Sequence, residues 1–86
     1  MSNFLNLIFV LNGQRIMIQA TSEDIFAEVA LRYIQKAGLQ DQAPKFFYNS
    51  AELKLESGKT LNELHIGPQS NIDVVLSNLV IGALSI

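Results

Sequence analysis

TSEDIFAEVALRYIQKAGL, residues 21–39, is the stretch from which the fold can be worked out, because it has clear helical periodicity. Its apolar residues recur at intervals of three and four, and so lie along one stripe of a helix: Phe26, Val29, Ala30, Tyr33 and Ala37. Thr21, Ser22 or Asp24 is expected to cap the first turn, and Gly38 to end the helix in a left-handed conformation. A lone amphipathic helix has to bury its stripe, and the segments on either side have the composition of strands. The sequence therefore predicts one helix packed on one sheet.

The composition indicates one small domain. The chain has 86 residues, of which 49% are hydrophobic and 16% charged, so a disordered chain is excluded. The net charge of −2 offers no basic footprint for nucleic acid, and no apolar run approaches the roughly 20 residues that span a bilayer. The start of the chain, MSNFLNLIFVLNG, lacks the features of a secretory signal, and there is no cysteine. A cytoplasmic or nuclear protein that binds neither nucleic acid nor membrane is expected.

A β-hairpin is predicted for residues 4–20. Asn12-Gly13 is a strong signal for a two-residue type I′ turn, since both residues accept a positive φ. Folding about this turn gives one core-facing set of residues: Leu5, Leu7, Phe9, Ile16, Ile18 and Ala20. The opposite face then carries Asn6, Ile8, Val10, Arg15, Met17 and Gln19. That second face is more apolar than a solvated sheet surface usually is.

Three short strands are predicted after the helix. Lys45–Tyr48 and Ala51–Leu53 flank an Asn-Ser turn signal, and Ile72–Leu76 forms the last strand. Alternation along this last strand turns Asp73 and Val75 away from the helix. The residues expected in the core around the helix are Phe46, Leu61, Ile72 and Val74, buried with Val29 and Tyr33.

The order of these elements predicts an α+β fold, because a mixed sheet of four to five strands curled around one helix would bury every apolar stripe. The chain also resembles the ubiquitin-like β-grasp family from about Leu5 to Leu76. The resemblance is carried by SGKTLNELHI, residues 57–66, and SNIDVVL, residues 70–76, which are similar to the Gly-basic-Thr-Leu stretch and final strand of ubiquitin. It implies a ubiquitin-like domain at 5–76, with residues 1–4 as an N-terminal extension and residues 77–86 as an apolar tail or linker.

The tail differs from that of ubiquitin, which is joined to lysine through a C-terminal Gly-Gly. Here Leu76 is followed by SNLVIGALSI, in which Gly82 stands alone. Two lysines that ubiquitin uses to build chains correspond to Ala51 and Pro68. The resemblance therefore implies a non-conjugating domain. The alternative is a ubiquitin-like covalent modifier, or a precursor fragment whose processed C-terminus is absent from this sequence.

The resemblance further implies a protein-binding surface on the outer face of the sheet. Phe47 corresponds to the central isoleucine of ubiquitin's apolar patch and Val75 to its valine, while Asp73 and Ser77 stand where ubiquitin has a histidine and an arginine. The full set predicted to bind protein adds neighbours on the first strand and one cation of the rim: Ile8, Val10, Leu11, Lys45, Phe47 and Val75. In ubiquitin-like sheets the first strand lies beside the last and the last beside the third, so the apolar members are expected to form one continuous strip.

No residue pattern predicts catalysis, a cofactor or a metal. His65 has no second histidine or cysteine to support it, and Ser57 and Ser70 have no base in a recognisable arrangement. The predicted function is therefore that of a non-enzymatic interaction domain or adaptor in the ubiquitin pathway. Its expected partner is a protein: a ubiquitin-receptor-like domain, a helix or a strand segment. Weak self-association through the tail or the sheet face is also expected. A strand-pairing effector domain for a small GTPase ranks last, because only Arg15 supplies the basic second strand.

Overall fold

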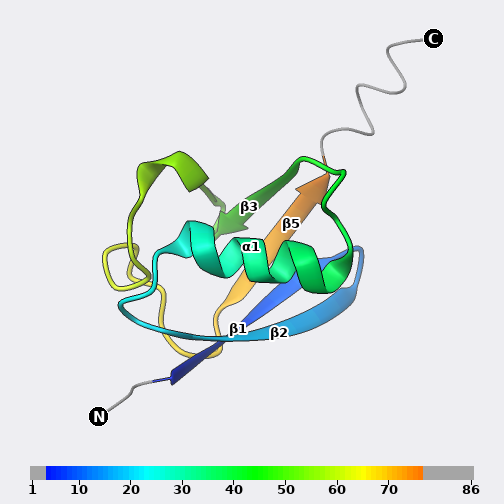
Figure 1. Ribbon diagram of the computed structural model, residues 1–86. Coiled ribbons are helices and arrows are strands. Elements are labelled where there is room, and N and C mark those ends of the chain that lie inside the picture. Colours follow the sequence, from blue (N-terminus) through cyan, green and yellow to red (C-terminus); the bar gives the residue numbers. More distant parts are fainter. Residues whose placement is uncertain (1–3, 77–86) are drawn as a thin grey trace, which may run out of the picture.

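A computed structural model describes residues 4–76, so the predicted apolar tail at 77–86 lies outside the described residues. In chain order the elements are β1 (Phe4–Leu11), β2 (Gln14–Thr21), α1 (Phe26–Ala37), β3 (Pro44–Tyr48), β4 (Ala51–Leu53), the 3₁₀ turn η1 (Leu55–Ser57) and β5 (Asn71–Leu76). The strands form one sheet in the order β2-β1-β5-β3-β4, in which β1 and β5 are parallel and the other pairs antiparallel. The helix α1 lies across one face of this sheet (Figure 1). The predicted α+β fold with a mixed sheet around one helix is confirmed.

The hairpin of β1 and β2 forms as its turn predicts. Asn12 and Gly13 have φ values of 52° and 80°, which suit a type I′ turn. The register pairs Phe9 with Ile16 and Leu7 with Ile18, as expected. β1 begins at Phe4, as predicted for the hairpin, although the domain boundary taken from the resemblance placed this residue in the N-terminal extension.

The start of α1 differs from the expectation. The helix begins at Phe26, and no side chain caps it; the Phe26 N–H instead donates to the Lys59 carbonyl, 3.0 Å away. The predicted caps at Thr21, Ser22 and Asp24 are therefore wrong, because a carbonyl from a distant loop takes over the capping role. The predicted end is confirmed, since Gly38 has a φ of 73° and closes the helix in a left-handed conformation.

The loop that supplies this carbonyl is fastened to the connection between β2 and α1. The N–H groups of Leu61 and Asn62 donate to the carbonyls of Asp24 and Ser22, each at 2.9 Å. Within the loop, the Thr60 N–H donates to the Glu63 carboxylate at 2.9 Å, and the Glu63 N–H donates to the Thr60 hydroxyl at 3.1 Å. This reciprocal pair orients the loop so that the Leu61 side chain is fully buried.

Between α1 and the sheet lies a core built around four aromatic rings. Phe9 stacks on Tyr33 with ring centroids 4.5 Å apart, and Phe46 meets Phe9 and Phe26 edge to face at 5.7 and 5.6 Å. Such offset and edge-to-face contacts add to the stabilisation from burial. Burial also raises the pKa of the Tyr33 hydroxyl. The predicted core set of Phe46, Leu61, Ile72 and Val74 with Val29 and Tyr33 is confirmed.

Candidate protein-binding surface

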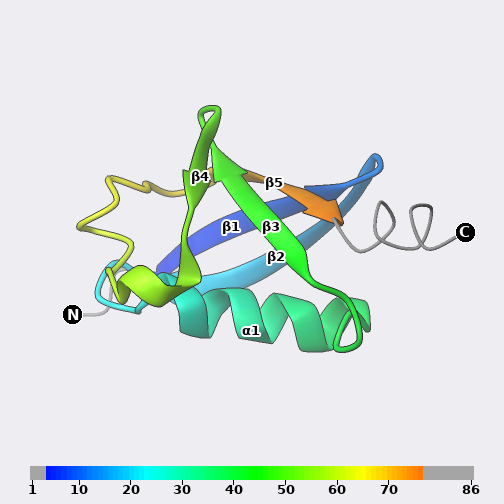
Figure 2. The same cartoon turned by 90° about the horizontal axis from the view of Figure 1, so that it is seen from above.

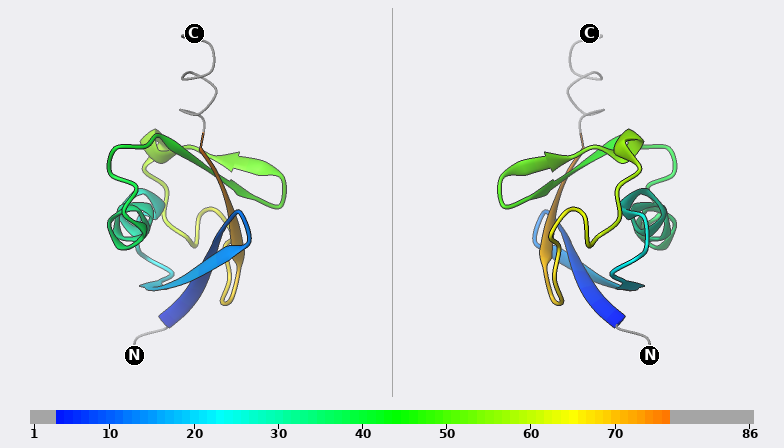
Figure 3. Two further views of the ribbon diagram at one scale, coloured as in Figure 1. Left: turned by 90° about the vertical axis from the view of Figure 1, so that its right-hand side faces the viewer. Right: turned by 90° about the vertical axis from the view of Figure 1, so that its left-hand side faces the viewer.

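One face of the sheet is turned away from α1 (Figures 2 and 3). Strand alternation places the predicted binding residues on this face, with the exception of Leu11. Register sets their neighbours: on β5, Asp73 pairs with Val10 of β1 on one side and with Phe47 of β3 on the other. In the next row, Val75 of β5 pairs with Lys45 of β3. Three strands that are far apart in the sequence therefore bring their outward-facing side chains together.

The outward-facing apolar residues have only part of their surface covered. Val75 is 49% exposed, whereas Ile8, Val10 and Phe47 are half-buried and Lys45 is exposed. None of these four apolar side chains belongs to the core cluster or packs against it. Part of each side chain therefore remains open to solvent on this face.

Met17 belongs to this face and was not predicted as a binding residue. It pairs with Ile8 across the hairpin and is 54% exposed. The hairpin register already placed Met17 on the outer face, but the sequence did not show that its side chain is exposed. We call five neighbouring apolar residues of this face the outer patch: Ile8, Val10, Met17, Phe47 and Val75. Phe4, 58% exposed, lies on the same face of β1 further along the strand.

Asp73 interrupts the outer patch. It is exposed and lies directly between Val10 and Phe47, so the expectation of one continuous apolar strip is wrong in that row. Apolar contact across β5 has to run through Val75, which is the diagonal neighbour of both Val10 and Phe47. Asp73 makes no ion pair or side-chain hydrogen bond with any of residues 4–76.

Leu11 is not brought onto this face. Alternation along β1 places it on the same side as Phe9, and it is half-buried and packs against the core. With Val74, Val75 and Leu76 it lines a hollow of about 190 Å³ beside the hairpin turn. Leu11 was predicted as a substitute for the patch residue that ubiquitin carries in its first turn, because the turn in this chain is shorter.

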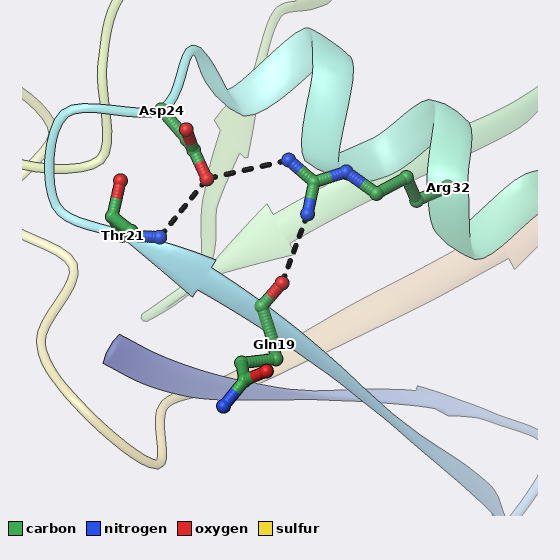
Figure 4. A network of polar contacts seen from close by, with 4 residues as sticks. All are labelled: Gln19, Thr21, Asp24 and Arg32. Atoms are coloured by element: carbon green, nitrogen blue, oxygen red, sulfur yellow. Dashed lines mark hydrogen bonds and ion pairs between the residues drawn. The ribbon is translucent and has the colours of Figure 1, made fainter. Parts of the chain in front are cut away.

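At the free edge of the sheet, β2 has partners for some of its backbone groups. The Thr21 N–H donates to the Asp24 carboxylate at 2.9 Å, and the Arg32 guanidinium donates to the Gln19 carbonyl at 2.9 Å (Figure 4). Arg32 also lies 3.3 Å from the Asp24 carboxylate, in an ion pair that links α1 to this edge. The Thr21 hydrogen bond, followed by Arg32, holds the pKa of Asp24 below its ordinary value. An added strand could not use these two backbone groups without displacing this pair.

A second concave region lies between the end of α1 and strands β3 and β4. It encloses about 450 Å³, and its apolar lining includes Ile34, Phe46 and Leu53. Two lysines and two glutamates also line it, so it favours neither sign of charge.

Side chains that could bind a metal or act in catalysis do not cluster in the part of the chain that the structure covers. Across residues 4–76, no three histidine, aspartate or glutamate side chains are placed to hold a metal ion. His65 is exposed in a turn with a φ of 59°. Over the same range, no helix combines the length and apolarity that crossing a membrane requires.

Comparison with known proteins gives a likeness of fold. No family model matches the chain, and no curated protein matches it in sequence. A crystal structure of ATBAG1 in complex with HSP70 matches with a TM-score of 0.76 and 15% identity, over 92% of this chain and 44% of that chain. This chain thus spans less than half the length of the one it matches, and the part it matches is a ubiquitin-like domain. Strand order, register and this likeness together show a ubiquitin-like β-grasp fold.

Proposed function

We propose that this chain is a non-conjugating ubiquitin-like interaction domain that binds protein partners through the outer patch. The observation that carries the proposal is the convergence of exposed or half-buried apolar side chains from β1, β2, β3 and β5 on one face. The core lies on the opposite face and does not use them. Contiguous exposed apolar area on a small domain usually marks an interaction site.

Phe47 is the expected centre of the interface. Aromatic side chains dominate the binding energy of protein interfaces, and Phe47 is the one aromatic residue of the outer patch. Val75 lies beside it, diagonal across the β3–β5 pair, and provides exposed area at the middle of the sheet. Lys45, the neighbour of Val75, is placed at the rim.

Two further observations support a binding role on the face of the sheet. The ATBAG1 structure shows a chain containing this fold in complex with another protein, which is consistent with use of the fold for recognition. The Asp24–Arg32 pair occupies backbone groups of the β2 edge, which favours docking on the face over strand addition there. A non-enzymatic role, an adaptor role in the ubiquitin pathway and a cytoplasmic or nuclear location are parts of this proposal.

The test compares two adjacent phenylalanines on opposite faces. Peptides are first selected for binding to the 86-residue chain from a displayed library of amphipathic helices with a randomised apolar stripe. Phe47→Ala should weaken the selected peptides by roughly 30-fold, equivalent to about 2 kcal/mol, while unfolding free energy falls by less than about 1 kcal/mol. Phe46→Ala, the control in the core, should cost about 3–5 kcal/mol of stability.

Thermal and urea melts of both variants supply the stability values, and titration calorimetry supplies the affinities. The proposal fails if Phe47→Ala destabilises the fold as much as Phe46→Ala and leaves peptide affinity unchanged. It also fails if selected peptides shift the backbone amide resonances of α1 and not those of β1, β3 and β5.

A further inference from the structure

Asp73 occupies the middle of the outer patch and has no ion-pair partner among residues 4–76. One row of the sheet runs from β2 to β4 through Arg15, Val10, Asp73, Phe47 and Glu52. Val10 and Phe47 are therefore the immediate cross-strand neighbours of Asp73. Its carboxylate is exposed, and in the described part of the chain it has no ion pair.

A partner that covers Val10 and Phe47 has to cover Asp73 as well. Burying an unpaired carboxylate is costly, because the charge loses its hydration and gains nothing in return. Residues 4–76 offer no close compensation: Lys45 lies diagonal to Asp73 and makes no ion pair with it, and Arg15 is two strands away. The compensating cation therefore has to come from the partner.

We propose that the outer patch binds an amphipathic helix that carries one arginine or lysine within its apolar stripe, placed over Asp73. This inference rests on the proposed function and specifies its partner. Neighbouring strands lie about 4.8 Å apart, and side chains three or four residues apart on a helix are separated by about 5–6 Å. A helix crossing the strands can thus place a cation on Asp73 and apolar side chains on Val10 and Phe47. Arginine suits the site best, because its planar fork can pair with a carboxylate through two hydrogen bonds.

The same geometry argues against a second copy of the chain as the occupant. A symmetric dimer presents the same surface from both partners. If its axis passed near the centre of the outer patch, the two Asp73 carboxylates would be brought together without a cation between them. Charge complementarity therefore favours a cationic helix.

The experiment measures the charge preference of the surface with a defined probe. The displayed helix library described above is selected separately against the wild-type chain, Asp73→Asn, Asp73→Lys and Asp41→Lys. Asp41 is also exposed but lies in the connection between α1 and β3, so Asp41→Lys is a control of equal charge change. In the selections on the wild-type chain and on Asp41→Lys, arginine and lysine should be enriched at least about tenfold at one position of the peptide's apolar stripe. A tenfold preference is within the range of coupling energies for paired charges at an interface.

Asp73→Asn should abolish that enrichment, and Asp73→Lys should replace it with aspartate or glutamate. In one selected peptide, exchange of the cation for glutamate should weaken binding to the wild type by about tenfold or more and restore it to Asp73→Lys. If Asp73→Lys does not fold, as judged by its melting curve, the isosteric Asp73→Asn decides the outcome.

The two proposals fail in different ways. Peptides that lack the cation but lose affinity with Phe47→Ala would overturn the charge inference and leave the binding surface intact. Cationic peptides that bind Asp73→Asn as well as the wild type would also overturn the inference. Peptides indifferent to both Phe47→Ala and Asp73→Asn would overturn the proposed function itself.

Discussion

Both faces of β5 carry a valine, but the two valines lie in different environments. On the inner face, Ile72 is fully buried and Val74 is 6% exposed, and both belong to the core. On the outer face, Asp73 is exposed and Val75 is 49% exposed, with no core contact. Burial explains a valine on the inner face, but it does not explain one that remains half exposed. The proposed binding surface would account for the exposed valine, because a partner would cover it.

Phe46 and Phe47 show the same contrast between adjacent residues. Phe46 is 1% exposed and meets the rings of Phe9, Phe26 and Tyr33 edge to face. Phe47 is half-buried, and among residues 4–76 its ring makes no contact with another aromatic ring. Strand alternation alone separates one phenylalanine that stabilises the fold from its neighbour that faces outward.

The largest expected effect on stability comes from truncating a buried side chain on the inner face of β5. Ile72→Ala should lower the unfolding free energy by about 2–5 kcal/mol, because it removes buried methyl groups and leaves a cavity. The total unfolding free energy of a domain of this size is small, so the variant should be close to unfolding. Chemical denaturation followed by circular dichroism measures the loss.

Val75→Ala is the matched variant on the outer face of the same strand. It should change the unfolding free energy by no more than about 0.5 kcal/mol, as exposed positions usually do. Equal losses from Ile72→Ala and Val75→Ala would contradict the division between the two faces. A loss below about 0.5 kcal/mol for Ile72→Ala would also contradict it, because Ile72 would then not face the core.

An intermediate effect is expected from Asp24, which has hydrogen-bond and ion-pair partners, and no effect on stability from Asp73. Asp24→Asn should cost about 0.5–1.5 kcal/mol near neutral pH, mainly because the hydrogen bond from the Thr21 N–H loses its charged acceptor. The ion pair with Arg32 adds little to this, because that side chain is 47% exposed. Asp73→Asn should leave stability unchanged within about 0.5 kcal/mol, since Asp73 has no such partner among the described residues.

The pH dependence of stability tests the role of the Asp24 carboxylate directly. The folded-state pKa of Asp24 lies below its ordinary value of 3.8, so its contribution is fully present above that value. It is lost as the pH falls below 3.8 and through the folded-state pKa, because the unfolded chain then binds the proton more readily. Melting temperatures measured across this acid range should fall less steeply for Asp24→Asn than for the wild type. An unchanged slope would contradict a role for the Asp24 carboxylate.

Local features of this fold were predictable from the sequence, and features set by distant segments were not. Asn12-Gly13 fixed the hairpin register because a type I′ turn determines which residues face each other. The cap of α1 was missed because Lys59 supplies it from another part of the chain. The interruption by Asp73 was missed because it follows from how β5 aligns with both β1 and β3.

The binding surface was predictable to a similar degree. Alternation placed Ile8, Val10, Phe47 and Val75 on the outer face, because side chains along a strand point alternately to its two sides. It also placed Met17 there, but only the structure shows how exposed that residue is. Leu11 entered the predicted set through the resemblance alone, and its position on the core side follows from the same alternation.

The smallest expected effect concerns Lys45, which the resemblance places among the binding residues and the structure places beside Val75. If the partner helix is cationic, Lys45 repels it weakly from the rim, and Lys45→Ala should strengthen binding by about two- to threefold at low salt. The gain should vanish as salt is raised, because exposed charges are screened. Lys36→Ala, on the exposed side of α1, is the control and should leave affinity unchanged.

Weaker binding of the selected cationic peptide to Lys45→Ala at all salt concentrations would instead make Lys45 a direct contact. Stability should stay within about 0.5 kcal/mol of the wild type in either case, so the sign of the affinity change decides which role the lysine has.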